Sequence, residues 1–181
     1  LRLKAIVVRG LTDAQIVKRA DLLRTDSVHG AFKGVVDIDL ASQSMIVNGQ
    51  RIKFIDGGNP EDIDYTQYGI NDALLIDNTG AFTTKEKLSR HLKAKGVSKV
   101  LLTAPGSEIP NIVYGINSQN LDIETNDIFS AASCTTNCIV PILHLVENKY
   151  GVVKGHVETV HSYTNDQNLL DNMHRSPRRG R

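Results

Sequence analysis

The feature that most constrains the fold is an alternation of short apolar runs with helical patterns. Residues 3–8 (LKAIVV) suit a buried parallel strand, and a helical pattern begins at about Asp13, which we expect to be its N-cap. One face of that helix contains the apolar residues Ile16, Val17, Ala20 and Leu23. A second strand–helix–strand unit comprises ALLID, a helix over Lys85–Lys95, and KVLLTAP. This alternation predicts an α/β fold with a parallel sheet.

The sequence between these two units predicts antiparallel strands. The runs VVDIDL and SMIVNGQRIKFI alternate apolar and polar residues, as expected for strands with one buried face. Asn48-Gly49, inside the second run, is a strong signal for a two-residue hairpin turn.

After the second unit the pattern changes. TNDIFSA predicts a strand that leads into a helix beginning at Cys134, and VVKGHVETVHSYT predicts a longer strand with alternating faces. We therefore expect a parallel α/β domain followed by an antiparallel-rich one, with the boundary near Ser133. The chain begins inside a strand pattern and ends within a basic segment, so we expect it to be a piece of a longer protein.

Composition and charge argue against several classes of function. The 21 basic and 20 acidic residues give a net charge of +1, and the aromatic content is 5%, so we expect no nucleic-acid partner. No apolar run approaches the roughly 20 residues needed to cross a bilayer, so we expect no membrane partner. Two cysteines four residues apart, without a signal peptide, favour a reducing compartment, and we expect a cytoplasmic protein.

Both cysteines lie at the start of the apolar helical run SAASCTTNCIVPILHLVENKY. Ser133 is a good N-cap, so we expect Cys134 where free backbone N–H groups and the positive end of the helix dipole converge. That environment favours the nucleophilic thiolate, and the same N–H groups can stabilise an oxyanion or hold a phosphate. Cys138 lies one turn further on, and we expect it to be buried and less reactive.

Spacing alone leaves three interpretations of these cysteines open. Both can be small core residues. A zinc site would need further ligands such as His144 or His161, and C-x3-C is not a usual ligand pair. In the third interpretation Cys134 is a reactive thiol, and His161, expected at a strand end, stabilises the thiolate and transfers its proton. A lone histidine is more often structural, so the pairing is a hypothesis.

The blocks SAASCTTNC and HSYTNDQ resemble the glyceraldehyde-3-phosphate dehydrogenase family, whose nucleophile motif is S-C-T-T-N-C. His161 follows Cys134 by 27 positions (161 minus 134), the spacing of that family's catalytic pair. The blocks DSVHGAFKG, DNTGAFTT, LLTAPG, YGIN and RRGR resemble the family in the right order. The resemblance implies a partial Rossmann-like dinucleotide-binding domain in residues 1–133, followed by the start of an α+β catalytic domain in residues 134–181.

The resemblance also implies a reaction. A member of this family is a phosphorylating oxidoreductase that converts glyceraldehyde 3-phosphate, NAD(P) and inorganic phosphate to 1,3-bisphosphoglycerate, usually as a homotetramer. Cys134 would form the covalent thioester and His161 would act as the base. Five residues match the family's substrate and phosphate sites: Ser133, Thr135, Thr164, Asp166 and Arg179. Each has a structural explanation as well, since Ser133 can be only a cap and RSPRRGR a solvated basic face.

The cofactor implied by the resemblance is NAD. Four residues resemble the loops beside the dinucleotide: Asn78, Thr79, Gly80 and Thr103. The family's G-x-G-x-x-G turn is not in these residues; we expect it upstream of Leu1, and we do not expect the 181 residues to bind NAD well. Arg9 stands where the family usually has an acidic residue that binds the adenosine ribose, and an arginine can attract a 2′-phosphate, so NADP is an alternative.

Two alternatives to the leading function remain. Erythrose-4-phosphate dehydrogenase uses a similar Cys/His pair, although Tyr163 and Thr164 resemble the triose-phosphate enzyme more. A non-catalytic, dehydrogenase-like binding module is favoured by the missing glycine turn and by the departures at Arg9 and Asn78.

Overall fold

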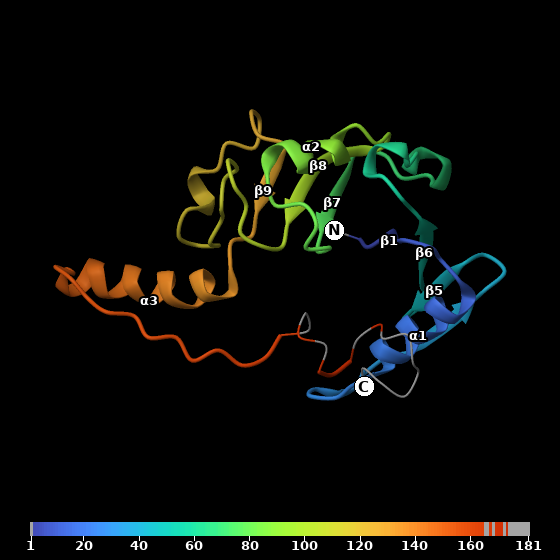
Figure 1. The fold of residues 1–181 in the computed structure, drawn as a ribbon, viewed down its shortest axis with the longest axis horizontal. Helices are drawn as coiled ribbons and strands as arrows, with labels where there is room; N and C mark the ends of the chain where they lie inside the picture. Colours follow the sequence, from blue (N-terminus) through green and yellow to red (C-terminus); the bar gives the residue numbers. More distant parts are fainter. Residues whose placement is uncertain (1, 165–166, 168, 172, 174–181) are drawn as a thin grey trace. The chain divides into compact units, whose positions relative to one another are not determined.

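A computed structural model describes residues 2–164, 167, 169–171 and 173 of the chain. The chain divides into two compact units, the first comprising Leu1–Gly58 with Val160–Arg181 and the second comprising Asn59–Thr159. Each unit has a sheet of its own (Figure 1). Each also has its own hydrophobic core.

The first unit is built on a mixed four-stranded sheet with the order β1-β6-β5-β4. β1 (Ala5–Val8) pairs in parallel with β6 (Gln50–Asp56). β5 (Ser44–Val47) is antiparallel to both β6 and β4 (Val36–Asp39), as the alternating runs predict. β1 lies at the sheet edge and Val8 is its one buried residue, so the expected strand is parallel but only partly buried.

The hairpin between β5 and β6 turns at the predicted dipeptide. Asn48 and Gly49 both have left-handed backbone conformations, with φ of 50° and 79°. A two-residue turn with positive φ at both positions matches the twist of the flanking strands, and Asn-Gly adopts it at little cost. The prediction of this turn is confirmed.

Helix α1 (Asp13–Arg24) packs against β4 and β5. Its N-cap is Thr12, whose side chain accepts a hydrogen bond from the Gln15 backbone N–H, so the prediction of Asp13 as the cap is wrong by one residue. A threonine oxygen and an aspartate oxygen can both cap a helix, and the sequence does not show which one has the extended backbone that a cap needs. Two short paired strands follow, β2 (Thr25–Asp26) and β3 (Gly30–Ala31).

The core of the first unit lies between α1 and the sheet. Its buried members are Ile16, Ala20, Val36, Met45, Ile52 and Phe54. Leu23 packs against this core in a partly buried position, whereas Val17 is 37% exposed. The predicted apolar face of α1 is therefore correct at three of its four positions.

The second unit contains a parallel three-stranded sheet with the order β7-β8-β9. Its strands are β7 (Ala73–Asp77), β8 (Val97–Leu102) and β9 (Ile128–Ser130). Helix α2 (Lys85–Leu92) packs against β8, and the shared core is formed by Leu88, Val100, Leu102, Ile109 and Ile128. Three short 3-10 helices belong to the same unit: η1 (Pro60–Asp62), η2 (Tyr65–Tyr68) and η3 (Ser118–Asn120). The predicted strand–helix–strand arrangement is confirmed.

α2 ends three residues before the predicted Lys95. The chain has to reverse before β8, and it does so through Gly96, which has a φ of 96°. A side chain at Gly96 would lie 2.4 Å from the Ile70 carbonyl oxygen, so glycine is required at this turn.

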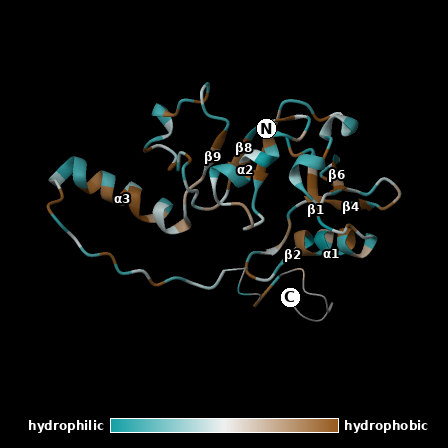
Figure 2. Ribbon diagram, turned by 45° about the horizontal axis from the view of Figure 1, so that its top comes forward, coloured by the Kyte–Doolittle hydropathy of each residue, from teal (hydrophilic) through white to brown (hydrophobic). Residues whose placement is uncertain are grey.

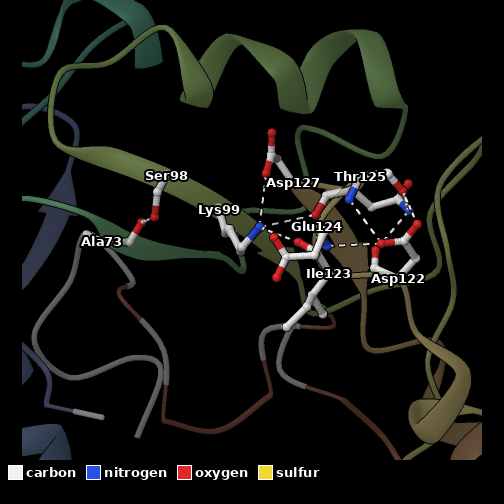
Figure 3. A network of polar contacts seen from close by, with 9 residues as sticks. Ala73, Ser98, Lys99, Asp122, Ile123, Glu124, Thr125 and Asp127 are labelled. Atoms are coloured by element: carbon white, nitrogen blue, oxygen red, sulfur yellow. Dashed lines mark hydrogen bonds and ion pairs between the residues drawn. The ribbon is translucent and has the colours of Figure 1, made fainter.

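The loop before β9 is tied to β8 by a lysine (Figure 3). Lys99 Nζ donates to the Ile123 carbonyl (2.8 Å) and to a carboxylate oxygen of Asp127 (3.0 Å). Asp122 closes the start of the loop by accepting from the backbone N–H groups of Glu124 and Thr125 (Figure 3). These contacts fix where β9 enters the sheet, and β9 leads directly to the next helix.

Helix α3 (Cys134–Tyr150) begins at the predicted residue, and none of its residues is buried. Figure 2 shows both hydrophobic and hydrophilic residues along it, and the exposed apolar ones include Ile142, Leu143, Leu145 and Val146. Among the described residues, no helix is long and apolar enough to span a bilayer.

The long strand predicted for VVKGHVETVHSYT is not formed. Residues 151–164 contain neither helix nor strand, and all of them are exposed. An alternating pattern specifies a strand only where a neighbouring strand supplies the hydrogen-bonding partners, and none of the described strands pairs with this segment. His161 is consequently not at a strand end, which corrects the prediction.

Candidate active site

Cys134 is exposed and is the first residue of α3. Ser133 is the N-cap, as predicted: its backbone is extended, and its Oγ accepts a hydrogen bond from the Thr136 backbone N–H at 2.9 Å. The N–H groups of the first helical turn lack intrahelical partners and lie at the positive end of the helix dipole. This environment favours a thiolate at Cys134 and suits an oxyanion beside it.

Two hydrogen bonds from backbone N–H groups fix the turn that precedes Cys134. The Ala131 N–H donates to the Leu102 carbonyl of β8 (2.8 Å), and the Ala132 N–H donates to Ser130 Oγ (2.9 Å). Ala132 is buried with a φ of 58°, a left-handed conformation that is uncommon for a residue with a Cβ. Such a conformation persists where the surroundings fix it. The turn therefore sets the direction in which α3 leaves the sheet.

Asn137 closes the same turn from within the helix. Its Nδ2 donates to the carbonyl oxygens of Ala131 and Ser133, both at 2.8 Å. No role was predicted for Asn137 from the sequence. A signal was available, because asparagine disfavours helix interiors unless its side chain bonds to nearby backbone.

Cys138 is exposed, so the prediction that it is buried is wrong. The prediction assumed that the inner face of α3 is covered, whereas no residue of this helix is buried in the structure. Exposure alone therefore does not distinguish the two thiols. The two thiols differ in their position: Cys134 lies at the N-terminus of α3, and Cys138 lies one helical turn further along.

His161 is exposed and belongs to the first unit, whereas Cys134 belongs to the second. Its Nδ1 lies 2.6 Å from the Ser162 carbonyl, so this nitrogen is the donor in that contact. Their pairing as a catalytic pair stays a prediction.

The other predicted phosphate-site residues are only partly described. Thr135 is the second residue of α3 and is half-buried. Thr164 is exposed, and its backbone N–H donates to Gln167 Oε1 at 3.1 Å. Asp166 and Arg179 lie outside the described residues. Among the described residues, no cluster of three or more metal-ligating side chains is present.

The predicted cofactor residues of the second unit lie at the carboxyl ends of its parallel strands. Asn78, Thr79 and Gly80 form an exposed loop directly after β7. Thr103 follows β8, and its N–H and Oγ1 both donate to the Asp77 carbonyl, at 3.0 and 3.2 Å. The structure therefore brings these four residues together at one edge of the sheet. Arg9 is exposed after β1 in the first unit.

A buried carboxylate lies under this edge. Asp77 is 2% exposed and accepts hydrogen bonds from the Thr79 N–H and Oγ1, each at 2.8 Å, while its other oxygen lies 2.8 Å from His91 Nε2. Burial acts to raise the pKa of Asp77, but the hydrogen bonds from His91 and Thr79 outweigh it, so the pKa lies below its usual value of 3.8.

This lowered pKa gives a testable pH dependence. A carboxylate with a depressed pKa in the folded state stabilises the fold above its ordinary pKa, and the contribution is lost as the pH falls through the folded value. We expect the difference in unfolding free energy between the wild type and Asp77→Asn to be largest above pH 3.8 and to shrink below it. Urea titrations at a series of pH values measure this difference. A difference that grows on acidification would contradict the assignment.

Comparison with known proteins identifies the family of two parts of the chain. A model of the glyceraldehyde 3-phosphate dehydrogenase NAD binding domain matches residues 2–85, and a model of the C-terminal domain of the same enzyme matches residues 133–181. The chain belongs to the glyceraldehyde-3-phosphate dehydrogenase family. The family predicted from the blocks around Cys134 and His161 is confirmed, as is the fold class of a Rossmann-like domain followed by the start of a catalytic domain.

Individual glyceraldehyde-3-phosphate dehydrogenases are similar along most of the chain. A glyceraldehyde-3-phosphate dehydrogenase-like protein of Pseudomonas aeruginosa is 57% identical over 100% of the chain and 39% of its own length. Glyceraldehyde-3-phosphate dehydrogenase 2 of Trichormus variabilis is 45% identical over 90% of the chain and 47% of its own length. The enzyme of Clostridium pasteurianum is 38% identical over 96% of the chain. The chain thus spans about half the length of these relatives, or less.

The edge formed after β7 and β8 fits the family's cofactor. Dinucleotides bind outside the carboxyl ends of parallel strands, where backbone groups can approach the ligand. Gly80 has a φ of 73°, and a Cβ built on it has no heavy atom within 4 Å, so the loop presents open backbone there. The predicted cofactor, NAD, is confirmed by the match to this family's NAD-binding domain. NADP stays a prediction that rests on Arg9.

Proposed function

We propose that the full-length protein is a phosphorylating aldehyde dehydrogenase that converts glyceraldehyde 3-phosphate, NAD and inorganic phosphate to 1,3-bisphosphoglycerate. The observation that supports this most is the exposed thiol of Cys134 at the capped N-terminus of α3. Family membership supplies the reaction class, since the relatives named above are glyceraldehyde-3-phosphate dehydrogenases.

The proposed chemistry begins at Cys134. Its thiolate attacks the aldehyde carbon and forms a carbon–sulfur bond, while the carbonyl oxygen becomes an oxyanion that the first N–H groups of α3 can stabilise. His161 donates a proton to this oxyanion and takes it back from the thiohemiacetal hydroxyl as hydride leaves the carbon. NAD, when bound, supplies the hydride acceptor. Inorganic phosphate then attacks the resulting thioester and releases the thiolate.

Ser133 can contribute to phosphate binding only in one hydrogen-bonding arrangement. Its hydroxyl already accepts from the Thr136 N–H, and its Oγ lies 2.6 Å from Thr136 Oγ1. A hydroxyl has one donor and two acceptor positions. Ser133 can therefore donate to phosphate if Thr136 Oγ1 donates to Ser133. We propose Thr135, Thr164, Asp166 and Arg179 as its partners in the substrate and phosphate sites.

The remaining assignments follow from the same family. We propose that residues 1–133 form the NAD-binding domain, with Asn78, Thr79, Gly80 and Thr103 beside the cofactor and Arg9 near its adenosine ribose. Residues 134–181 begin the catalytic domain. The protein is proposed to be a cytoplasmic homotetramer whose partners are a small phosphorylated aldehyde and inorganic phosphate.

The test is an assay of reduced nicotinamide formed by the full-length protein. We expect turnover with glyceraldehyde 3-phosphate that requires inorganic phosphate, and faster turnover with NAD than with NADP. Faster turnover with erythrose 4-phosphate would identify the alternative enzyme. Protein that binds NAD but oxidises neither aldehyde would support the non-catalytic module and refute the proposal.

A further inference from the structure

The loop after β7 is hydrogen-bonded to the carboxylate of Asp77, the last residue of that strand. Asp77 Oδ1 accepts from both the N–H and the Oγ1 of Thr79, and Thr79 Oγ1 accepts in turn from the Ala81 N–H at 3.1 Å. These three bonds close a tight turn in which Gly80 adopts its positive φ. Asn78, Thr79 and Gly80 are all exposed, so the turn holds its outer backbone open to solvent.

The same carboxylate is bonded to the helix that follows the loop. Asp77 Oδ2 lies 2.8 Å from Nε2 of His91 on α2, with side-chain exposures of 0% and 9%. A buried carboxylate is costly unless its oxygens are hydrogen-bonded, and here both are. The Asp77–His91 contact therefore joins the strand before the loop to the helix after it.

A second contact anchors the far end of the loop to α2. The ring of Phe82 packs edge-on against His91 with centroids 5.1 Å apart, and the Arg90 guanidinium lies 5.7 Å from the centre of the Phe82 ring. Arg90 is itself fixed by Glu61, which accepts from its Nε and Nη2 at 3.0 to 3.1 Å. Both ends of the loop are thus attached to one helix.

We propose that Asp77 and His91 are positioning residues that hold the Asn78–Gly80 loop in its cofactor-receiving conformation before the cofactor arrives. Binding to a loop that is already ordered does not incur the entropy cost of ordering it, so the affinity is higher. Neither side chain needs to touch the dinucleotide. The inference rests on the proposed place of this loop beside NAD.

The chain contains a matched control for this arrangement. Asp64 also accepts from the N–H and Oγ1 of the threonine two residues later, Thr66, and it lies in the same unit. Its other oxygen faces Lys95 at 3.4 Å, and the Lys95 side chain is 76% exposed. Asp64→Ala therefore removes the same kind of turn without touching the loop after β7.

The experiment compares NAD affinity across variants of the full-length protein, by calorimetric titration well below each variant's Tm. We expect Asp77→Ala to raise the Kd for NAD by roughly tenfold, since it removes the hydrogen bonds that order the loop. Asp64→Ala should leave the Kd unchanged. His91→Leu should weaken binding more than His91→Gln, because glutamine retains a side-chain donor for Asp77. If Asp77→Ala does not fold, Asp77→Leu and the His91 pair give the same comparison.

A measurement on NAD-free protein distinguishes loss of loop positioning from a general loss of stability. In NAD-free protein, amide exchange at Thr79 and Ala81 should be faster in the Asp77 and His91 variants and unchanged in Asp64→Ala. Equal Kd values for Asp77→Ala and the wild type would overturn the inference, and so would equal weakening by Asp64→Ala. Gly80→Val tests the loop itself: if it leaves NAD affinity unchanged, the proposed cofactor site is wrong. If Gly80→Val weakens binding and the Asp77 and His91 variants do not, only the positioning role fails.

Discussion

Replacement of Cys134 by serine is expected to lower turnover of glyceraldehyde 3-phosphate in the full-length protein by a factor on the order of 10³ or more. Cys134 is exposed at the first position of α3, where the helix N-terminus favours an anion. A serine hydroxyl has a far higher pKa than a thiol, so the same environment does not ionise it. The rate of nicotinamide reduction measures the loss, and calorimetric titration should show unchanged NAD affinity.

Cys138 provides the matched control for this prediction. Both thiols are exposed, so a difference in their reactivity cannot be attributed to access. Cys138→Ser should retain turnover, and iodoacetamide at neutral pH should alkylate Cys134 faster than Cys138 because alkylation requires the thiolate. Equal alkylation rates, or full turnover by Cys134→Ser, would contradict the assignment of Cys134 as nucleophile.

The parts of the fold that the sequence predicts well are those set by local chemistry. Asn48-Gly49 specifies its turn because few residue pairs accept positive φ at both positions. Ser133 caps α3 because a short side-chain oxygen can reach the free N–H of Thr136. The parallel order of β7, β8 and β9 follows from strands separated by helical or long connections.

The predictions that fail depend on partners distant in the chain. The strand expected over VVKGHVETVHSYT needs a neighbouring strand, and the burial expected for Cys138 needs a covering layer on α3. The described part of the chain supplies neither. The prediction of Asp13 as the N-cap of α1, where the structure has Thr12, is a local error of one residue, since both residue types can cap a helix.

In the candidate site, too, some residues could be predicted from the sequence and others could not. The resemblance selected Asn78, Thr79, Gly80 and Thr103, and the structure shows why they lie together, at the ends of adjacent parallel strands. It does not select Asp77 and His91, which are 14 residues apart and meet only because α2 folds back onto the sheet. A hydrogen bond of this kind leaves no pattern in the sequence, whereas a nucleophile motif does.

His161→Asn is the second prediction with a large expected effect. We expect turnover to fall roughly 10²- to 10⁴-fold, the range associated with loss of a general base. An imidazolium beside Cys134 would also stabilise its thiolate, so the pH at which iodoacetamide alkylation becomes fast should rise in the variant. Asparagine keeps a side-chain donor, which can preserve the contact to the Ser162 carbonyl while removing the titratable ring.

His156 is the control for this variant, because it lies in the same segment between residues 151 and 164 and is also exposed. Its Nε2 is 3.2 Å from a carboxylate oxygen of Glu158, so its position has a local explanation. His156→Asn should change neither turnover nor the alkylation profile. Similar losses for the two histidines would indicate disruption of the segment and not loss of a base.

A double variant decides whether Cys134 and His161 act as one unit. When two residues act together in catalysis, removing both lowers turnover little more than removing one. In the Cys134→Ser background, His161→Asn should therefore have almost no further effect on turnover, although alone it costs a factor of at least about 10². Losses that multiply would mean that the two side chains act independently, and the catalytic pair would then be wrong. This result does not depend on whether residues 151–164 form a strand, because it measures the coupling directly.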